Sequence, residues 1–287
     1  MFNQFFSFLE NINYKYYKFF NKIEHTGKIA SCFRFIKFHL VRKQNNINFY
    51  ANNADRINAI VNMLADEKSK KTYLAMIKFR QTRNKEDFPF SNNNEIPYFT
   101  KEIVSRFSKD EVFIDCGAYN GDTIDDFLKY CSEYKQVIAF EPLSENVEEI
   151  KKKYVKNSKI TLINAGVYDK DDVVNFIGGG CGGRIFKTKN DEKNVKIQVK
   201  AIDNLNIESV TFIKMDVEGA ELNALKGAEK TIIRDKPKLA ICLYHSNEDM
   251  LSIAEYINKI VPEYKLYVAH YGPYPVFEGT VLYAILP

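Results

Sequence analysis

The spacing of hydrophobic positions divides the chain into two parts. Up to about residue 90, apolar residues recur at every third or fourth position, which predicts amphipathic helices over 2–20, 28–43 and 54–83. A loop then follows at 87–97, which contains Pro89, three consecutive asparagines and Pro97. We therefore predict a helical N-terminal extension at 1–90 and a second domain at 91–287.

Beyond the loop, short apolar runs alternate with amphipathic stretches. The runs predict strands at 112–115, 137–140, 160–163, 211–215, 238–243, 264–270 and 280–286, and the stretches predict helices at 122–131, 144–156, 219–233 and 247–260. Wholly apolar strands separated by helices are typical of a parallel sheet that is covered on both faces. The short connection between the last two runs predicts an antiparallel strand at the end of the sheet. The fold class is therefore α/β, with a doubly wound sheet.

One further pair of strands is predicted outside this alternation. Residues 172–177 and 195–200 flank the glycine-rich stretch 178–183, a pattern that indicates an inserted hairpin. The tip of this hairpin, at 178–184, is either a lid over a site or a loose turn.

The composition excludes several classes of protein. The chain has 287 residues, of which 45% are hydrophobic and 27% charged, the ordinary balance of a globular protein. No apolar run reaches the roughly 18 residues that span a bilayer, and the first residues lack the pattern of a signal peptide. The five cysteines are scattered without a Cys-x-x-Cys pair. We therefore expect reduced thiols, a cytoplasmic protein and no zinc site.

Positive charge is concentrated near the N-terminus. Although the net charge is only +4, residues 1–45 hold eight basic and two acidic side chains, together with nine of the 22 phenylalanines. The first expectation is a helical layer that packs its aromatic side chains against the main domain. Peripheral contact with an anionic membrane surface, at its inner face, is the alternative. We expect no nucleic-acid partner, because no known nucleic-acid motif accompanies the charge.

Candidate chemistry lies where the predicted strands end, because an open α/β sheet binds ligands beyond the carboxyl ends of its strands. The first strand ends at Asp115 and opens into Gly117-x-x-x-Gly121. This spacing matches neither the dinucleotide fingerprint nor the phosphate-binding P-loop. An aspartate beside the loop instead favours a ligand with a positive group or with hydroxyl and amine donors.

The other strand ends carry polar residues too. Glu141 follows the second strand and is placed to accept hydrogen bonds from ribose hydroxyls. Small residues that can flank an adenine ring, Asn164 and Ala165, follow the third. After the fourth and fifth strands come three carboxylates and an imidazole: Asp216, Glu218, Glu221 and His245.

These motifs, taken in order, resemble the FkbM-type S-adenosylmethionine-dependent methyltransferases. The matching stretches are EVFIDCGAYNGDT at 111–123, FEP at 140–142, FIKMDVEGAEL at 212–222 with LKGA at 225–228, and PKLAICLYH at 237–245. The resemblance covers about residues 95–287. It implies a class I (Rossmann-like) methyltransferase fold, with a seven-stranded sheet and an antiparallel last strand. It also implies S-adenosyl-L-methionine as the cofactor, and O-methylation of a sugar, a glycan or another small-molecule hydroxyl.

The resemblance implies roles for individual residues. Asp115, Gly117 and Gly121 would surround the methionine end and ribose of the cofactor, Glu141 would hold the ribose, Asn164 and Ala165 would lie near adenine, and Asp216 near the amino group or the methyl donor. The pair Tyr98-Phe99 looks like a segment that covers the cofactor in some members of the family.

For the acceptor, we nominate His245 as the base that removes the hydroxyl proton, with Asp216 as an alternative base or as the group that orients it. Glu218 and Glu221 are candidates to bind sugar hydroxyls, or to chelate a divalent cation together with Asp216; the spacing requires no metal. Two other functions remain open. One is a nucleotide-binding α/β oxidoreductase, and the other is a non-catalytic scaffold held at a membrane by the basic helices.

Overall fold

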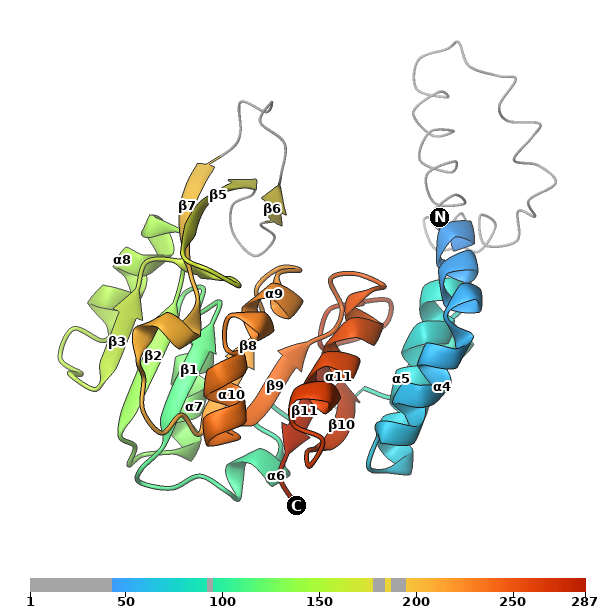
Figure 1. Ribbon diagram of the computed structural model, residues 1–287, viewed down its shortest axis with the longest axis horizontal. Coiled ribbons are helices and arrows are strands. Elements are labelled where there is room, and N and C mark those ends of the chain that lie inside the picture. Colours follow the sequence, from blue (N-terminus) through green and yellow to red (C-terminus); the bar gives the residue numbers. More distant parts are fainter. Residues whose placement is uncertain (1–42, 92–94, 178–183, 187–194) are drawn as a thin grey trace, which may run out of the picture.

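The computed structural model describes residues 43–91, 95–177, 184–186 and 195–287. Its centre is a seven-stranded sheet in the order β10-β11-β9-β8-β1-β2-β3 (Figure 1). The strands are β1 (Val112–Cys116), β2 (Gln136–Phe140), β3 (Ile160–Ile163), β8 (Phe212–Met215), β9 (Lys238–Cys242), β10 (Lys265–His270) and β11 (Thr280–Ile285). Strands β3, β2, β1, β8 and β9 pair in parallel, whereas β11 is antiparallel to both β9 and β10. This confirms the predicted α/β sheet with an antiparallel last strand.

Helices cover both faces of the sheet. One face is covered by α9 (Glu221–Lys226), α10 (Glu229–Asp235) and α11 (Asp249–Ile260), and the other by α6 (Lys101–Val104), α7 (Asp122–Tyr130) and α8 (Ser144–Lys153). Because side chains alternate along a strand, each strand supplies both cores. Within β1, Val112, Ile114 and Cys116 face the first core, and Phe113 faces the second.

Two of the predicted helices are interrupted. The predicted helix 54–83 forms two helices, α4 (Ala54–Met63) and α5 (Glu67–Thr82). Between them, Leu64 forms a β-bridge with Leu266, and the side chain of Asp66 accepts a hydrogen bond from the first turn of α5 (2.6 Å). Likewise, 219–233 forms the two short helices α9 and α10 instead of one. The sequence analysis treated each of these stretches as one helix.

A second, four-stranded sheet lies beyond the carboxyl ends of the large one (Figure 1). It consists of β4 (Gly166–Val167), β5 (Asp172–Ile177), β6 (Arg184–Phe186) and β7 (Val195–Lys200). The antiparallel pairing of β5 with β7 confirms the predicted hairpin, and β4 and β6 extend it on its two sides. The predicted lid or turn lies almost entirely at 178–183, outside the described residues.

The described part of the N-terminal extension packs on the α/β domain. Residues 43–52 are helical, and α4 and α5 share one hydrophobic core with α11 and β10 (Figure 1). The hydroxyl of Tyr73 on α5 donates a hydrogen bond to the backbone oxygen of Met250 (2.9 Å). The predicted helix 2–20 and nearly all of 28–43 lie outside the described residues. Among the helices that are described, none has the length and apolar character needed to span a membrane.

Arg80 connects α5 to the segment that follows β9. Its guanidinium donates hydrogen bonds to the backbone oxygen of Tyr244 and to Oδ1 of Asn247 (3.2 Å). Asn247 also accepts a hydrogen bond from the hydroxyl of Tyr50 (3.0 Å) and donates one to Asn46 (2.7 Å). The N-terminal helices therefore hold the segment 244–247, which carries several of the candidate site residues.

His270 is a fully buried imidazole at the end of β10. Its Nδ1 lies 3.0 Å from Oγ1 of Thr280 on β11, and its ring meets the Phe88 ring edge-on with 5.1 Å between centroids. Burial lowers the pKa of His270 to about 4. The neutral ring is therefore part of the folded structure at physiological pH.

This burial predicts a pH dependence of stability. Between the folded pKa of about 4 and the unfolded value near 6.5, the unfolded chain binds a proton that the folded chain does not. Above pH 6.5, His270 therefore costs the folded state no stability. As the pH falls from 6.5 toward 4, proton binding by the unfolded chain lowers the free energy of unfolding. Urea denaturation at pH 7.5 and pH 5.0 measures how much the free energy of unfolding falls between these two pH values. This fall should be about 2 kcal/mol smaller in His270→Gln than in the wild type. Thr280→Val, which keeps the imidazole, should retain the wild-type pH dependence. If the free energy of unfolding fell equally in His270→Gln and the wild type, His270 would not be the source of this pH dependence.

Candidate active site

The loop between β1 and α7 passes very close to the end of β8. Gly117 has φ +86°, and a Cβ atom there would lie 2.0 Å from the backbone oxygen of Asp216. Gly121 has φ +83°, immediately before α7, and a Cβ atom there would lie 3.0 Å from the ring of Tyr154. Only glycine satisfies both the positive φ and the close approach. The loop therefore brings its backbone, at Gly117, to the wall of a cavity.

Asp115 and Lys214 form a buried ion pair below this loop. They are paired residues on the neighbouring strands β1 and β8, with 3.1 Å between Oδ1 and Nζ. The Lys214 ammonium also donates a hydrogen bond to the backbone oxygen of Gly117 (2.7 Å). Burial raises the pKa of Asp115 to about 6, despite the opposing effect of Lys214. Burial alone would lower the pKa of Lys214, but Asp115 and Asp216 outweigh it and hold that pKa above its ordinary value.

The pair changes the expected role of Asp115. Its side chain is fully buried and is absent from the described cavity wall, whereas Lys214 lines the cavity. Asp115 is therefore placed to support the loop through Lys214 instead of touching a ligand itself. The sequence analysis missed Lys214, although its signal was visible. A lysine inside the apolar strand FIKM shares a face of the sheet with Asp115 and has to be paired when buried.

Glu141 lies on the opposite side of the cavity, directly after β2. Its carboxylate accepts hydrogen bonds from the backbone N–H groups of Tyr119 (3.0 Å) and Leu143 (2.9 Å) and from Nδ2 of Asn146 (3.1 Å). Burial raises the pKa of Glu141, and these hydrogen bonds oppose the rise. The carboxylate is thus held in one orientation at the cavity wall.

Asn164 and Ala165 follow β3, where they were expected, but they do not line the described cavity. The amide of Asn164 donates hydrogen bonds to the backbone oxygens of Glu141 and Pro142, both at 3.0 Å. Ala165 is fully buried. The cavity wall is formed instead by the next two residues, which make up β4. Asn164 therefore braces the end of β2, and from this segment it is β4 that faces the cavity.

Asp216 follows β8 and faces the cavity. Its carboxylate accepts hydrogen bonds from the hydroxyls of Tyr98 (3.0 Å) and Tyr244 (2.8 Å). Burial alone would raise the pKa of Asp216, but the charges of Lys214 and His245 and the two hydroxyls bring it below its ordinary value. Tyr98 reaches the cavity, as the resemblance suggested, whereas its neighbour, at position 99, packs in the core.

His245 lies behind Asp216, surrounded by carboxylates. Its Nε2 is 3.5 Å from Asp216 and 3.4 Å from Glu218, and its Nδ1 is 3.0 Å from Glu221. Burial alone would lower the pKa of His245, but Glu218 and Glu221 outweigh it and raise the pKa to about 10. An imidazole that already carries a proton at neutral pH cannot accept another. This charge argues against the role of base that the sequence suggested.

The two glutamates after Asp216 differ in position. Glu218 lines the cavity, so it is placed to contact a substrate. Glu221 is fully buried; it begins α9 and accepts a hydrogen bond from the backbone N–H of Val217 (2.8 Å). The predicted contact of Glu221 with a substrate is therefore corrected, because the first turn of α9 directs this carboxylate into the protein.

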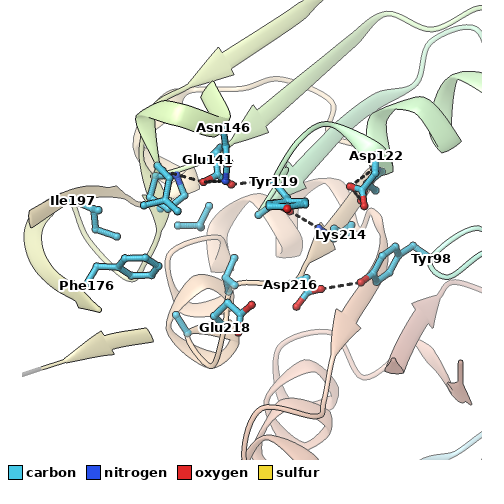
Figure 2. Close-up of a pocket in the computed structure, with 18 residues that line it drawn as sticks. Tyr98, Tyr119, Asp122, Glu141, Asn146, Phe176, Ile197, Lys214, Asp216 and Glu218 are labelled. Carbon is cyan, nitrogen blue, oxygen red and sulfur yellow. Dashed lines mark hydrogen bonds between the residues drawn. The ribbon is translucent and has the colours of Figure 1, made fainter. Parts of the chain in front are cut away.

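The cavity occupies about 1000 Å³, including the space at its open mouth. Figure 2 shows Glu141 on one side and Asp216 with Tyr98 on another, while Phe176 and Ile197 from the second sheet close a third side. The described wall also contains the glycine loop and Lys214. The cavity thus lies at the carboxyl ends of β1, β2 and β8, where the sequence predicted a ligand site.

Comparison with known proteins identifies the family. Residues 115–265, more than half of the chain, match the family described as "Methyltransferase FkbM domain". The chain therefore belongs to this family of methyltransferases. No curated protein matches the sequence.

One solved structure agrees with this assignment, and others match the chain more weakly. The crystal structure of Methyltransferase FkbM from Methylobacillus flagellatus KT matches 83% of this chain with a TM-score of 0.68 and 28% identity. The matched region spans only 60% of that longer protein. An rRNA methylase from Streptococcus thermophilus matches with a TM-score of 0.41 and 16% identity, over 64% of this chain and 92% of its own. A putative methyltransferase from Streptococcus mutans in complex with SAH matches with a TM-score of 0.38 and 13% identity, over 64% of this chain and 93% of its own. The fold is that of the class I methyltransferases.

The buried ion pair leads to a test of stability. Replacing Lys214 by Met leaves Asp115 buried and unpaired, so the free energy of unfolding at pH 7 should fall by about 3 kcal/mol. Adding Asp115→Asn should recover part of this loss, because the stranded charge is removed. Urea denaturation measures both variants. Lys151→Met, which removes an exposed pair with Glu148, should change stability by less than about 0.5 kcal/mol. A Lys214→Met variant as stable as this control would contradict the assignment.

Proposed function

We propose that this methyltransferase transfers a methyl group from S-adenosylmethionine to a hydroxyl of a sugar, a glycan or a natural product. The observation that carries the proposal is the charge of the cavity. Its described wall holds one ammonium, that of Lys214, and four carboxylates: those of Asp122, Glu141, Asp216 and Glu218. A wall of this charge attracts a cationic ligand and repels phosphates.

The residues present fit the cofactor. Glu141 is fixed by three hydrogen bonds and keeps lone pairs for the two hydroxyls of a ribose. The backbone at Gly117 approaches the cavity without a side chain in the way, and Asp216 supplies negative charge beside it. We assign Glu141 to the ribose, β4 and Phe176 to the adenine side, and Asp216 to the neighbourhood of the amino group or the sulfonium.

The same carboxylates favour a hydroxyl acceptor. Asp216 and Glu218 can accept hydrogen bonds but cannot donate them when ionised, so they suit an acceptor that presents hydroxyl protons. Sugars carry several such groups. Phosphate-rich acceptors would be repelled, in keeping with the expectation that nucleic acid is not the substrate. Ile197 and Phe176 from the second sheet would contact the apolar face of the acceptor or cofactor.

When bound, S-adenosylmethionine supplies an activated methyl group on a sulfonium centre. The protein then has to align the acceptor oxygen, a contribution worth roughly 7–11 kcal/mol of the barrier. Asp216 is the residue best placed to accept the acceptor's hydrogen bond and to orient it, because Tyr98 and Tyr244 hold its carboxylate at the wall. His245 then serves as a fixed neighbour of Asp216.

The two alternative functions have less support. A nucleotide-binding oxidoreductase would have to place a pyrophosphate among carboxylates, which the charge of the cavity disfavours. A non-catalytic scaffold would not require Glu141, Gly117 and Asp216 to converge on one cavity.

The cofactor assignment is tested by isothermal titration of S-adenosylmethionine into the purified protein. We expect micromolar binding by the wild type and at least tenfold weaker binding by Glu141→Gln, which removes one negative acceptor from the ribose site, an effect of about 1.4 kcal/mol. The control is Glu148→Gln, an exposed glutamate on the same chain segment, in α8. Failure of the folded wild type to bind would refute the cofactor and would favour the scaffold.

The acceptor is tested by transfer of a labelled methyl group to sugars, glycans, RNA and peptides. If the wild type transfers the label to sugar hydroxyls and Asp216→Asn does not, the result supports the proposal. Label in RNA or peptide alone would contradict it.

A further inference from the structure

Four side chains beside the cavity gather three carboxylates around one imidazole. We call Asp216, Glu218, Glu221 and His245 the carboxylate–histidine cluster. Within the described residues, Asp216, Glu221 and His245 can each offer a ligand atom such that all lie within 4.8 Å of one another. The Nε2 atom of His245 lies 3.5 Å from Asp216 Oδ1 and 3.4 Å from Glu218 Oε2. Such separations are close to those between neighbouring ligands of one metal ion, whose bonds are about 2.0–2.2 Å long.

The imidazole at the centre of the cluster is an independent sign of a ligand. The side chain of His245 is only 6% exposed, yet neither ring nitrogen makes a well-aligned hydrogen bond to any described residue. A buried oxygen of Glu221, Oε2, also has no described hydrogen-bond partner. Buried polar atoms almost always make good hydrogen bonds, so buried ring nitrogens that meet their carboxylate neighbours only at ion-pair distance require an explanation.

The surroundings of the cluster resemble the second layer of a metal site. Ligating imidazoles usually have their other nitrogen held by a carboxylate, and ligating carboxylates are themselves hydrogen-bonded. Here Glu221 lies against Nδ1 of His245 (3.0 Å) while Nε2 faces Asp216 and Glu218. Asp216 is held by the hydroxyls of Tyr98 and Tyr244.

We propose that Asp216, Glu218 and Nε2 of His245 bind a divalent cation at the wall of the cavity, with Glu221 orienting the imidazole. One nitrogen and two carboxylate ligands suit a first-row divalent ion such as Mn²⁺. The cation offsets the surplus of carboxylates around the imidazole. Asp216 and Glu218 line the cavity whereas His245 lies behind them, so the remaining coordination positions face the cavity.

A role for this ion follows only if the proposed function is right. In that case its open positions hold the acceptor hydroxyl, lower the pKa of that hydroxyl and favour release of its proton to water. The binding site itself does not depend on methyl transfer.

The test is titration of Mn²⁺ into the full chain after removal of metals with EDTA. Calorimetry should give one Mn²⁺ per chain, and the electron paramagnetic resonance signal of free Mn²⁺ should report the same ratio. The dissociation constant should rise at least tenfold in both Glu218→Gln and His245→Gln. Glu148→Gln, at an exposed position of α8, should bind as the wild type does.

Two results would overturn the proposal. One is a folded wild type that binds none of Mn²⁺, Mg²⁺ or Zn²⁺ at millimolar concentration, and the other is unchanged binding by Glu218→Gln. Because Glu218 is 32% exposed, its variant remains informative even if His245→Gln does not fold. Titration of S-adenosylmethionine into the same samples separates the two proposals. Mn²⁺ binding without cofactor binding would refute the function and keep the site, and the reverse result would refute the site alone.

Discussion

The charge pair between Asp115 and Lys214 is the constraint around which the site is built. Two ionised side chains in the middle of a sheet are costly to bury, and they are tolerated because they are direct partners on the adjacent strands β1 and β8. The pair also fixes the loop above it, because the Lys214 ammonium donates a hydrogen bond to the Gly117 backbone. The close approach of Gly117 to the end of β8 then positions Asp216. One interaction thus links the first glycine loop, the fourth parallel strand and the cavity.

The electrostatics of the cavity follow from the same arrangement. With Lys214 occupied by Asp115, the carboxylates of Glu141, Asp216 and Glu218 face the cavity without a matching number of cations. An open α/β sheet whose first loop follows the dinucleotide pattern presents backbone N–H groups to a pyrophosphate. Here the corresponding edge is acidic. The same general fold therefore selects a different class of ligand through the residues at its strand ends.

The N-terminal helices contribute to the site from a distance. Arg80 on α5 reaches the backbone of Tyr244, whose hydroxyl holds Asp216, and Asn247 joins this contact to Tyr50. The loop at 87–97, which the sequence pattern marked as a boundary, does not divide the core, because α4 and α5 share apolar contacts with β10 and α11. The described part of the extension therefore shares a hydrophobic core with the α/β sheet.

The sequence by itself determined the strands, their carboxyl ends and the antiparallel last strand, because these depend on local periodicity and on short connections. It also located Gly117, Glu141 and Asp216 at the cavity, since strand ends meet at one edge of a parallel sheet. Tertiary structure alone decided which side chains turn inward. It buried Glu221 at the start of α9, enclosed His245 among carboxylates that raise its pKa, and paired Asp115 with Lys214. These outcomes depend on neighbours from distant segments, and pKa values follow such neighbours more than sequence position.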